Sequence, residues 1–309
     1  MRPLLLIALF VLSPCASGED VAGNKPAGQF IDKSVVTYPI SLNHHTLVKE
    51  GFDPDRVADG VSLDYELGNA PKELQFNIYV YPRGRVDPAK AVADAMVEIE
   101  GEIRYIEQKK IYSDLQFQDD FEFDVAAPPA KVLARGHEQP VKLSEAPVTR
   151  ASSDAGETRD GELADALDSI SPPAKTIGRK RPLAMTVRGT REQSIAYVFY
   201  RNLFLISVRA TAPVTALPAD KFNALIDQAV QDLVPTMEIQ NFGGCGSIYL
   251  SVDTKSADKD KAASDGAVQL VREMARIQRE NCASKPGADL SPPQGRSQQT
   301  ITYPADFWQ

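Results

Sequence analysis

Alternation of apolar and polar residues predicts the strands of the first half of the chain. The clearest stretch is 74–81 (LQFNIYVY), where one face carries Leu74, Phe76, Ile78 and Val80. Strand character also marks 34–40, 60–65 and 115–125. In the last of these stretches (LQFQDDFEFDV), we expect one face to carry Phe117, Phe121 and Phe123.

A helical period follows residue 87. Asp87 is a favourable cap for a helix that has Pro88 as its first residue. Apolar residues then recur at spacings of 4, 3, 4 and 3, at Val92, Met96, Ile99, Ile103 and Ile106. This stripe between acidic residues predicts an amphipathic helix.

The second half of the chain predicts more strands and two helices. The ranges 183–189, 194–201 and 203–210 are apolar, with a turn at 201–202. Pro218 opens a helix that Pro235 ends, and its apolar face is Phe222, Leu225, Ile226, Ala229, Val230 and Leu233. A short strand over 247–252 precedes a charged helix over 256–281, which we expect to bury Ala267, Leu270, Val271, Met274 and Ile277.

Two stretches lack the apolar density of a core. Residues 126–182 contain no aromatic side chain and many prolines, which predicts a flexible insertion. We expect disorder over 283–300 and docking of the apolar end at 301–308. The predicted organisation is a signal peptide at 1–18, one α+β domain from 19–125 and 183–240, the insertion at 126–182, a disulfide-linked strand–helix extension at 241–282 and a tail at 283–309.

This order of elements resembles the PsbP-like fold, which includes photosystem extrinsic proteins and DcrB-type periplasmic lipoproteins. The resemblance rests on an acidic helix after a strand ending in YVYP (79–82), on the strand LFLISVRATAP (203–213), and on a closing helix opened by Pro218, Ala219 and Asp220. It covers 34–125 and 183–240, and it implies an α+β sandwich in which an antiparallel sheet packs against helices. The family implies docking and assembly rather than catalysis, and no functional residue is carried over to this chain.

The first 18 residues predict the compartment. Arg2 is followed by nine apolar residues (LLLIALFVL, 4–12) and then by small residues up to Gly18. The apolar run is shorter than the roughly 20 helical residues of a membrane span and is typical of a secretory signal peptide. We therefore expect cleavage after Ser17 or Gly18, a periplasmic protein, and no transmembrane span in the mature chain.

The cysteines add two predictions. Leu12-Ser13-Pro14-Cys15 resembles the bacterial lipoprotein box, so lipid anchoring in the envelope through Cys15 is the alternative to ordinary cleavage, although Pro14 departs from the box. After cleavage, Cys245 and Cys282 remain, and an even number of cysteines in an exported chain favours a disulfide. The alternative is a reactive thiol at Cys245, but no His or Arg lies near it in the sequence.

Composition and motifs exclude several classes of function. The 309 residues carry a net charge of −8, which gives no electrostatic basis for binding nucleic acid. The sequence contains no nucleophile elbow, Walker loop, dinucleotide fingerprint or HExxH zinc helix. The histidines are His44, His45 and His137, which do not form a set of metal ligands. We expect neither a cofactor nor a metal.

Two groups of residues are candidate sites. The acidic group is Asp120, Glu122 and Asp124, which share one face if the segment is a strand. A solvated strand face is the favoured interpretation, and a hydrolase site is the alternative. The second group is a candidate binding face, for which sheet packing is the favoured interpretation, formed by Tyr79, Tyr81, Tyr197, Phe199 and Arg201.

The favoured hypothesis is a non-enzymatic docking or binding module of the cell envelope that has an envelope protein as its partner. A periplasmic hydrolase is the first alternative and requires a concave pocket around the acidic group. A small-ligand carrier is the second alternative and requires a sizeable apolar cavity.

Overall fold

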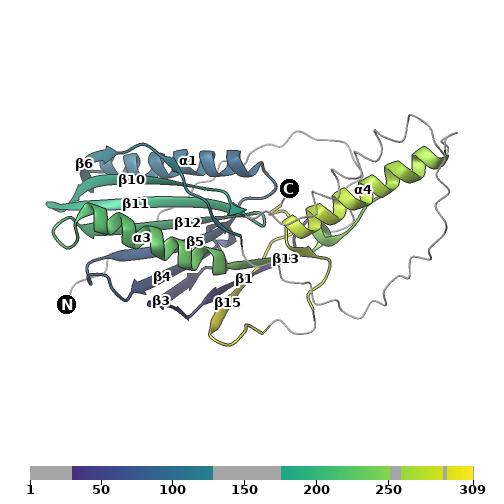
Figure 1. The fold of residues 1–309 in the computed structure, drawn as a ribbon, viewed down its shortest axis with the longest axis horizontal. Helices are drawn as coiled ribbons and strands as arrows, with labels where there is room; N and C mark the ends of the chain where they lie inside the picture. The colour runs from purple at the N-terminus through teal and green to yellow at the C-terminus, as the bar shows by residue number, and fades with distance from the viewer. Residues whose placement is uncertain (1–29, 128–174, 251–258, 288–290, 309) are drawn as a thin grey trace.

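The computed structural model describes residues 30–127, 175–250, 259–287 and 291–308 (Figure 1). Over these ranges the chain has an α+β fold in which a large antiparallel sheet packs against helices, as the sequence predicts. The signal peptide, Cys15 and most of the insertion predicted at 126–182 lie outside the described residues.

The large sheet has nine strands, all paired antiparallel. Eight of them lie side by side in the order β2 (Ser41–Leu42), β3 (His45–Phe52), β4 (Val61–Leu67), β5 (Gln75–Pro82), β12 (Phe204–Pro213), β11 (Thr190–Arg201), β10 (Gly178–Val187) and β6 (Tyr112–Phe117). The ninth strand, β7 (Phe121–Glu122), pairs with β10. The middle pair of this order is β5 and β12, and β12 forms a hairpin with β11 through the turn residues Asn202 and Leu203.

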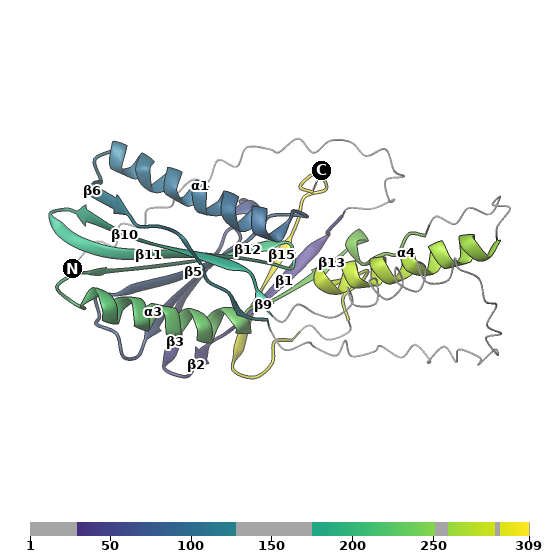
Figure 2. The ribbon, with the colours of Figure 1, turned by 45° about the horizontal axis from the view of Figure 1, so that its top comes forward.

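A second sheet of four strands lies beside the first (Figure 2). Its order is β14 (Cys282–Ala283), β13 (Glu238–Phe242), β1 (Lys33–Pro39) and β15 (Arg296–Thr302). A further pair, β8 (Val125–Ala126) and β9 (Lys175–Thr176), joins the two ends of the segment that the structure does not describe. Short 3-10 turns are η1 (Val57–Asp59), η2 (Val234–Thr236) and η3 (Gly244–Gly246).

Helices cover both faces of the large sheet. α1 (Pro88–Gln108) begins as predicted, because the Asp87 side chain accepts a hydrogen bond from the Lys90 backbone N–H at 2.9 Å. Its predicted stripe, from Val92 to Ile106, is buried. α3 (Ala219–Leu233) lies on the other face with its predicted apolar side inward.

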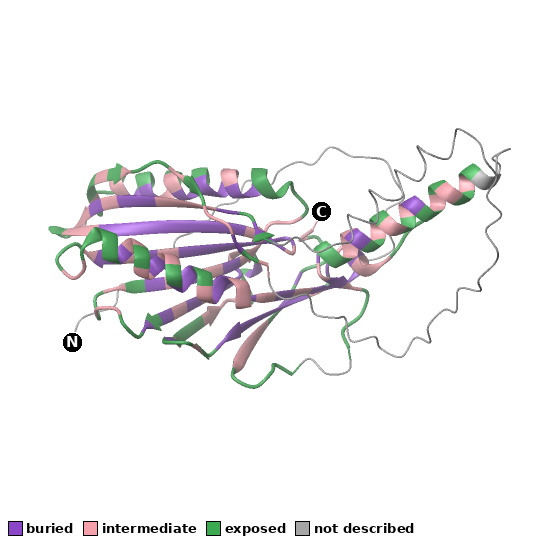
Figure 3. Cartoon of the chain, in the orientation of Figure 1, coloured by how far each residue is buried: buried purple, intermediate pink, exposed green. Residues whose placement is uncertain are grey.

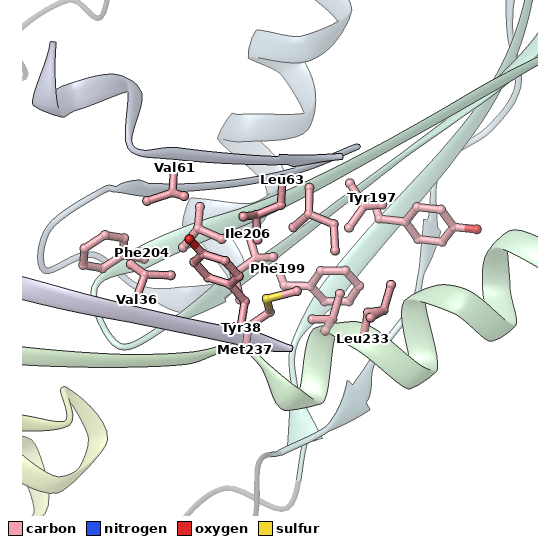
Figure 4. Packing of buried hydrophobic residues seen from close by; sticks show 14 of the residues in the cluster. Val36, Tyr38, Val61, Leu63, Tyr197, Phe199, Phe204, Ile206, Leu233 and Met237 are labelled. Atoms are coloured by element: carbon pink, nitrogen blue, oxygen red, sulfur yellow. The ribbon is translucent and has the colours of Figure 1, made fainter. Parts of the chain in front are cut away.

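The alternation along β11 divides the interior into two cores. Ala196 and Val198 face α1, whereas Tyr197 and Phe199 face α3 and the small sheet. The second core is the larger and joins both sheets, as the close packing of Phe199, Tyr38 and Met237 shows (Figure 4). The apolar end also docks there as predicted, with Tyr303 buried and Trp308 packed against Phe30 at 6.0 Å between ring centroids.

The prediction of one continuous strand over 115–125 is wrong. β6 ends at Phe117, and only two residues form β7, so the three phenylalanines do not share a face. Phe117 packs under α1, Phe121 is exposed, and Phe123 turns into the other core against Tyr197, at 5.0 Å between ring centroids. β6 pairs with residues 183–187 of β10, and β7 pairs with residues 179–180. The residues between β6 and β7 do not take part in this ladder.

Three further boundaries differ from the sequence predictions. β10 begins at Gly178 rather than 183, and residues 247–250 do not form a strand. The stretch expected to be disordered, 283–300, contains most of β15, which pairs with β1 along its whole length. β15 is polar except for Ile301, so its order comes from pairing with a strand more than 250 residues away, which a local pattern does not reveal.

α4 (Lys259–Arg279) projects beyond the ends of both sheets (Figures 1 and 2). The prediction that it buries Ala267, Leu270 and Met274 is wrong, because all three side chains are exposed. Its packed side is instead centred on Val268 and Ala275, and the other described side chains of the helix are half-buried or exposed (Figure 3).

Candidate functional site

The acidic group does not converge on a shared cavity. Asp120 accepts a hydrogen bond from Arg179 at 2.8 Å and lies 3.7 Å from Arg181. Asp124 accepts the backbone N–H of Gly178 at 3.2 Å, and Glu122 lies in the exposed strand β7. The structure therefore holds two of the three carboxylates in separate contacts with the end of β10.

These contacts also account for the basic run at 179–181. Successive residues of β10 face opposite sides of the sheet, so Arg179 and Arg181 point towards α1 and Lys180 towards α3. Arg181 pairs with Glu100 of α1, and the Lys180 ammonium contacts both carboxylate oxygens of Asp227, at 2.9 and 3.0 Å. The run is thus neutralised by ion pairs that join the sheet to both helices.

The residues proposed as one binding face lie on opposite faces of the sheet. Tyr79 and Tyr81 of β5 face the α1 side, whereas Tyr197 and Phe199 are fully buried on the α3 side. The Tyr197 hydroxyl donates to Asp227 at 2.6 Å. Arg201 is also buried, and its guanidinium donates to the backbone carbonyls of Val234 and Met237. These five side chains stabilise the packing and do not form a common surface.

His45 has a structural partner that no local sequence pattern indicates. Its Nε2 lies 3.1 Å from the carboxylate of Asp232 on α3, and the ring is buried. Hydrogen bonds from His45 and Gln228 lower the pKa of Asp232, against the opposing effect of its own burial. The neighbouring His44 is exposed, so the two adjacent histidines do not act together.

Among the described residues, one cavity lies between β3 and the small sheet. It has a volume of about 150 Å³ and is lined by Tyr38, Glu50, Gly51, Phe52, Val61 and Gln299. Ligand-binding pockets are typically about 300–1,000 Å³ and mostly apolar. Here the Tyr38 hydroxyl donates to Glu50 at 2.8 Å within a polar lining, which does not favour the carrier hypothesis.

Cys245 and Cys282 form the predicted disulfide, with their Cα atoms 5.9 Å apart and both side chains buried. The bond joins η3, which directly precedes the segment that contains α4, to β14, which directly follows that segment. Arg276 adds hydrogen bonds to the carbonyls of Cys245 at 2.8 Å and Ser247 at 3.1 Å. The disulfide and Arg276 therefore fix the base of α4 to the small sheet.

A chain of charged groups extends this anchorage to the large sheet. Glu280 is buried and accepts hydrogen bonds from both Arg276 and Arg85, the latter at 2.7 and 3.0 Å. Burial alone would lower the pKa of Arg276, but the carboxylates of Glu273 and Glu280 raise it above its usual value. The base of α4 is thus rigidly positioned by ion pairs as well as by the disulfide.

Beyond this base, apolar side chains are left open to solvent. On α4, Leu270 is 36% exposed and Met274 is 48% exposed, and Ala263 and Ala267 are also exposed. The segment 247–250 lies along the helix, where Gln269 donates to the Tyr249 carbonyl at 3.5 Å, and it exposes Ile248, Tyr249 and Leu250. We call residues 247–250 and α4 together the arm, and Ala263, Ala267, Leu270 and Met274 the stripe.

The stripe places four exposed apolar side chains in a row along one side of α4. Single exposed apolar side chains are normal, but contiguous apolar patches mark sites of interaction. The stripe and the segment 248–250 are the candidate functional site of this protein. The sequence did show their periodicity, but periodicity does not distinguish a helix side that packs inside its own domain from one that awaits a partner.

The disulfide leads to a direct test on protein recovered from the cells that produce it. Digestion without reduction should give one cross-linked peptide pair containing Cys245 and Cys282, because both sulfurs are buried and bonded. Mass spectrometry of the digest measures this, and a reduced digest is the control. Recovery of both peptides with free thiols before reduction would contradict the bond and the exported location together.

Comparison with models of known protein families and with curated protein sequences finds no match for this chain. Within the described ranges, no three His, Cys, Asp or Glu side chains gather as metal ligands. Over the same residues, no helix combines the length and the hydropathy that a membrane span needs. The geometry of the arm is therefore the main basis for a functional proposal.

Proposed function

We propose that this protein is an exported, non-enzymatic docking module of the cell envelope and that the arm is its docking element. The observation that carries the proposal is the uncovered apolar surface of the arm, on which Leu270, Met274 and Tyr249 are exposed. This surface stands on a helix held away from the sheets by a disulfide and ion pairs at its base.

The energetics of the helix support this role. A helix obtains most of its stability from burying an apolar side, and α4 has only a narrow packed side at Val268 and Ala275. Covering Leu270 and Met274 would bury two large side chains, and each contributes about 1–2 kcal/mol when taken fully out of water. Binding a partner would therefore complete a burial that the described part of the chain does not provide.

The exported location is supported by two features of the sequence and one of the structure. The pattern of residues 1–18 is typical of a signal peptide, with lipid anchoring through Cys15 as the alternative. The bonded pair Cys245 and Cys282 fits an oxidising compartment. The resemblance of the element order to the PsbP-like fold also favours docking over catalysis.

Neither alternative receives similar support from the described residues. A hydrolase would need free carboxylates around a pocket, whereas Asp120 is paired with Arg179 and Asp124 accepts from Gly178. A carrier would need a larger apolar cavity than the polar one beside Tyr38 and Glu50.

Site-specific photo-cross-linking in intact cells tests the proposal. A photoreactive amino acid at Leu270 should give a discrete adduct of one mass, because this side chain would be covered by the partner. The matched control is the same amino acid at Val97 of α1, which is 70% exposed and lies outside the arm. The adduct should disappear when Met274→Glu is added, because a charge beside the contact opposes burial.

The result that overturns the docking function is equally specific. If Leu270 and Val97 give the same faint, heterogeneous adducts, the stripe is ordinary solvent-exposed surface. Persistence of a Leu270 adduct after Met274→Glu would likewise show that the stripe does not make the contact.

A further inference from the structure

We propose that the occupant of the stripe is the stripe of a second copy of this chain, paired antiparallel to the first. This inference rests on the proposed docking function and names its partner. Three properties of the arm support it: the spacing of the stripe, the sizes of its side chains, and the charge of the arm relative to the remainder of the chain.

The spacing is that of a helix that pairs with another helix. Ala263, Ala267, Leu270 and Met274 follow one another at intervals of 4, 3 and 4 residues. Apolar residues at alternating intervals of three and four residues form the seam of two packed helices. The stripe runs over three turns of α4. It lies next to the side of the helix that carries the buried residues Val268 and Ala275.

The sizes of the side chains select the orientation. The half of the stripe towards the tip is small, at Ala263 and Ala267, and the half towards the base is large, at Leu270 and Met274. With a two-fold axis between residues 268 and 269, antiparallel helices place Ala267 opposite Leu270 and Ala263 opposite Met274. Every layer then joins a small to a large side chain, which fills the contact evenly.

A parallel pair would lack this complementarity. Each residue would face its own copy, so Leu270 would meet Leu270 while Ala267 met Ala267. The helices would be held apart at the large layers and leave gaps at the small ones, and unfilled gaps weaken packing.

Charge favours the same arrangement. Five Lys or Arg and three Asp or Glu residues give α4 a net charge of +2, so the rest of the chain carries −10 of the total of −8. Parallel arms would bring the two acidic remainders side by side at one end. Antiparallel arms of 21 residues place them at opposite ends of a helix pair about 30 Å long, well beyond the ~8 Å over which physiological salt screens charge.

Sedimentation of the purified, disulfide-intact chain tests the pairing. We expect a monomer–dimer equilibrium between about 1 and 100 μM, the range of a modest helix interface. Leu270→Glu should weaken dimerisation at least about tenfold, because each copy would bury a carboxylate against Ala267 of the other. The matched control is Arg272→Gln, which lowers the net charge by the same single unit at an exposed position off the stripe.

A second variant tests the orientation. In Ala267→Lys/Leu270→Glu, antiparallel helices place each lysine opposite a glutamate, whereas parallel helices place like charges opposite one another. We expect the double variant to recover dimerisation relative to Leu270→Glu alone. Failure to recover would overturn the antiparallel register, and circular dichroism at each step confirms that the helices remain folded.

The outcomes separate this inference from the function beneath it. A wild-type chain that stays monomeric at about 100 μM, or a Leu270→Glu variant that dimerises like the wild type, overturns self-pairing. If such a chain still gives a discrete Leu270 adduct with a different envelope protein, the docking function stands and only the identity of the partner changes. If Leu270 gives no specific adduct, both proposals fail.

Discussion

Raising the pH from about 10 to about 12 should unfold this protein, through the ionisation of tyrosines that the folded chain keeps neutral. Burial raises the pKa of Tyr81 to about 12, and arginines beside it offset only part of the effect. Burial likewise raises the pKa of four other tyrosines well above the usual value of 10, namely Tyr38, Tyr65, Tyr197 and Tyr303. For Tyr197, the Asp227 carboxylate that accepts a hydrogen bond from its hydroxyl adds to the increase in pKa.

The direction in which stability changes with pH follows from the number of protons bound in the folded and the unfolded state. Above about pH 10 the unfolded tyrosines lose their protons while the folded ones retain them, so stability falls as pH rises. Tyr81 alone contributes a loss of about 2 kcal/mol by pH 12, and domains are typically stable by only about 5–15 kcal/mol. Arg201 acts in the opposite direction, because burial lowers its pKa to about 10 and the folded state releases that proton first. One such group does not balance five tyrosines.

Substitution of one tyrosine makes the prediction specific. Tyr81→Phe should leave the free energy of unfolding at neutral pH within about 1 kcal/mol and raise it by about 1.4 kcal/mol near pH 11, relative to the wild type. Tyr105→Phe is the matched control, because Tyr105 is 57% exposed on α1 and its replacement should not move the alkaline midpoint. Urea titrations at the two pH values measure both effects. Equal shifts from the two variants would contradict a role for burial.

Elements with one buried side could be predicted from the sequence. α1 and β5 each have a regular apolar period with one recognisable boundary, because α1 begins at Pro88 and β5 ends at Pro82. β15 could not be predicted, because its polar residues are ordered by backbone pairing with β1. Local patterns report which side of an element is apolar, and they do not report distant backbone partners.

The candidate site also shows that local patterns do not report distant partners. The periodicity of α4 correctly identified an amphipathic helix, but the expectation that Leu270 and Met274 are buried assumed that the chain itself covers them. Similarly, the alternation around Asp120 placed three carboxylates on one face, whereas the contact with Arg179 of β10 depends on residues about 60 positions away. The assembled fold, and not the local pattern, determines which residues an apolar or charged side contacts.

Two glycines that look equivalent in the sequence should respond in opposite ways to alanine. Gly101 lies inside α1 with open space where a Cβ would be, so Gly101→Ala should stabilise the fold by about 0.5–1 kcal/mol through the lower helix propensity of glycine. Gly178 begins β10 opposite Phe199, and a Cβ there would overlap the Phe199 ring and approach the Phe123 carbonyl. Gly178→Ala should therefore destabilise the fold by about 3 kcal/mol.

A double-mutant cycle shows whether the Phe199 ring causes the second effect. Phe199→Leu alone should cost about 1–2 kcal/mol, because it leaves a space in the core that joins both sheets. If the ring is the obstacle, the same space accepts the new methyl group, and Gly178→Ala/Phe199→Leu should be at least about 1 kcal/mol more stable than the sum of the single changes predicts. Strict additivity would instead assign the cost to the backbone around Phe123, since a side-chain overlap between two contacting residues must appear as coupling.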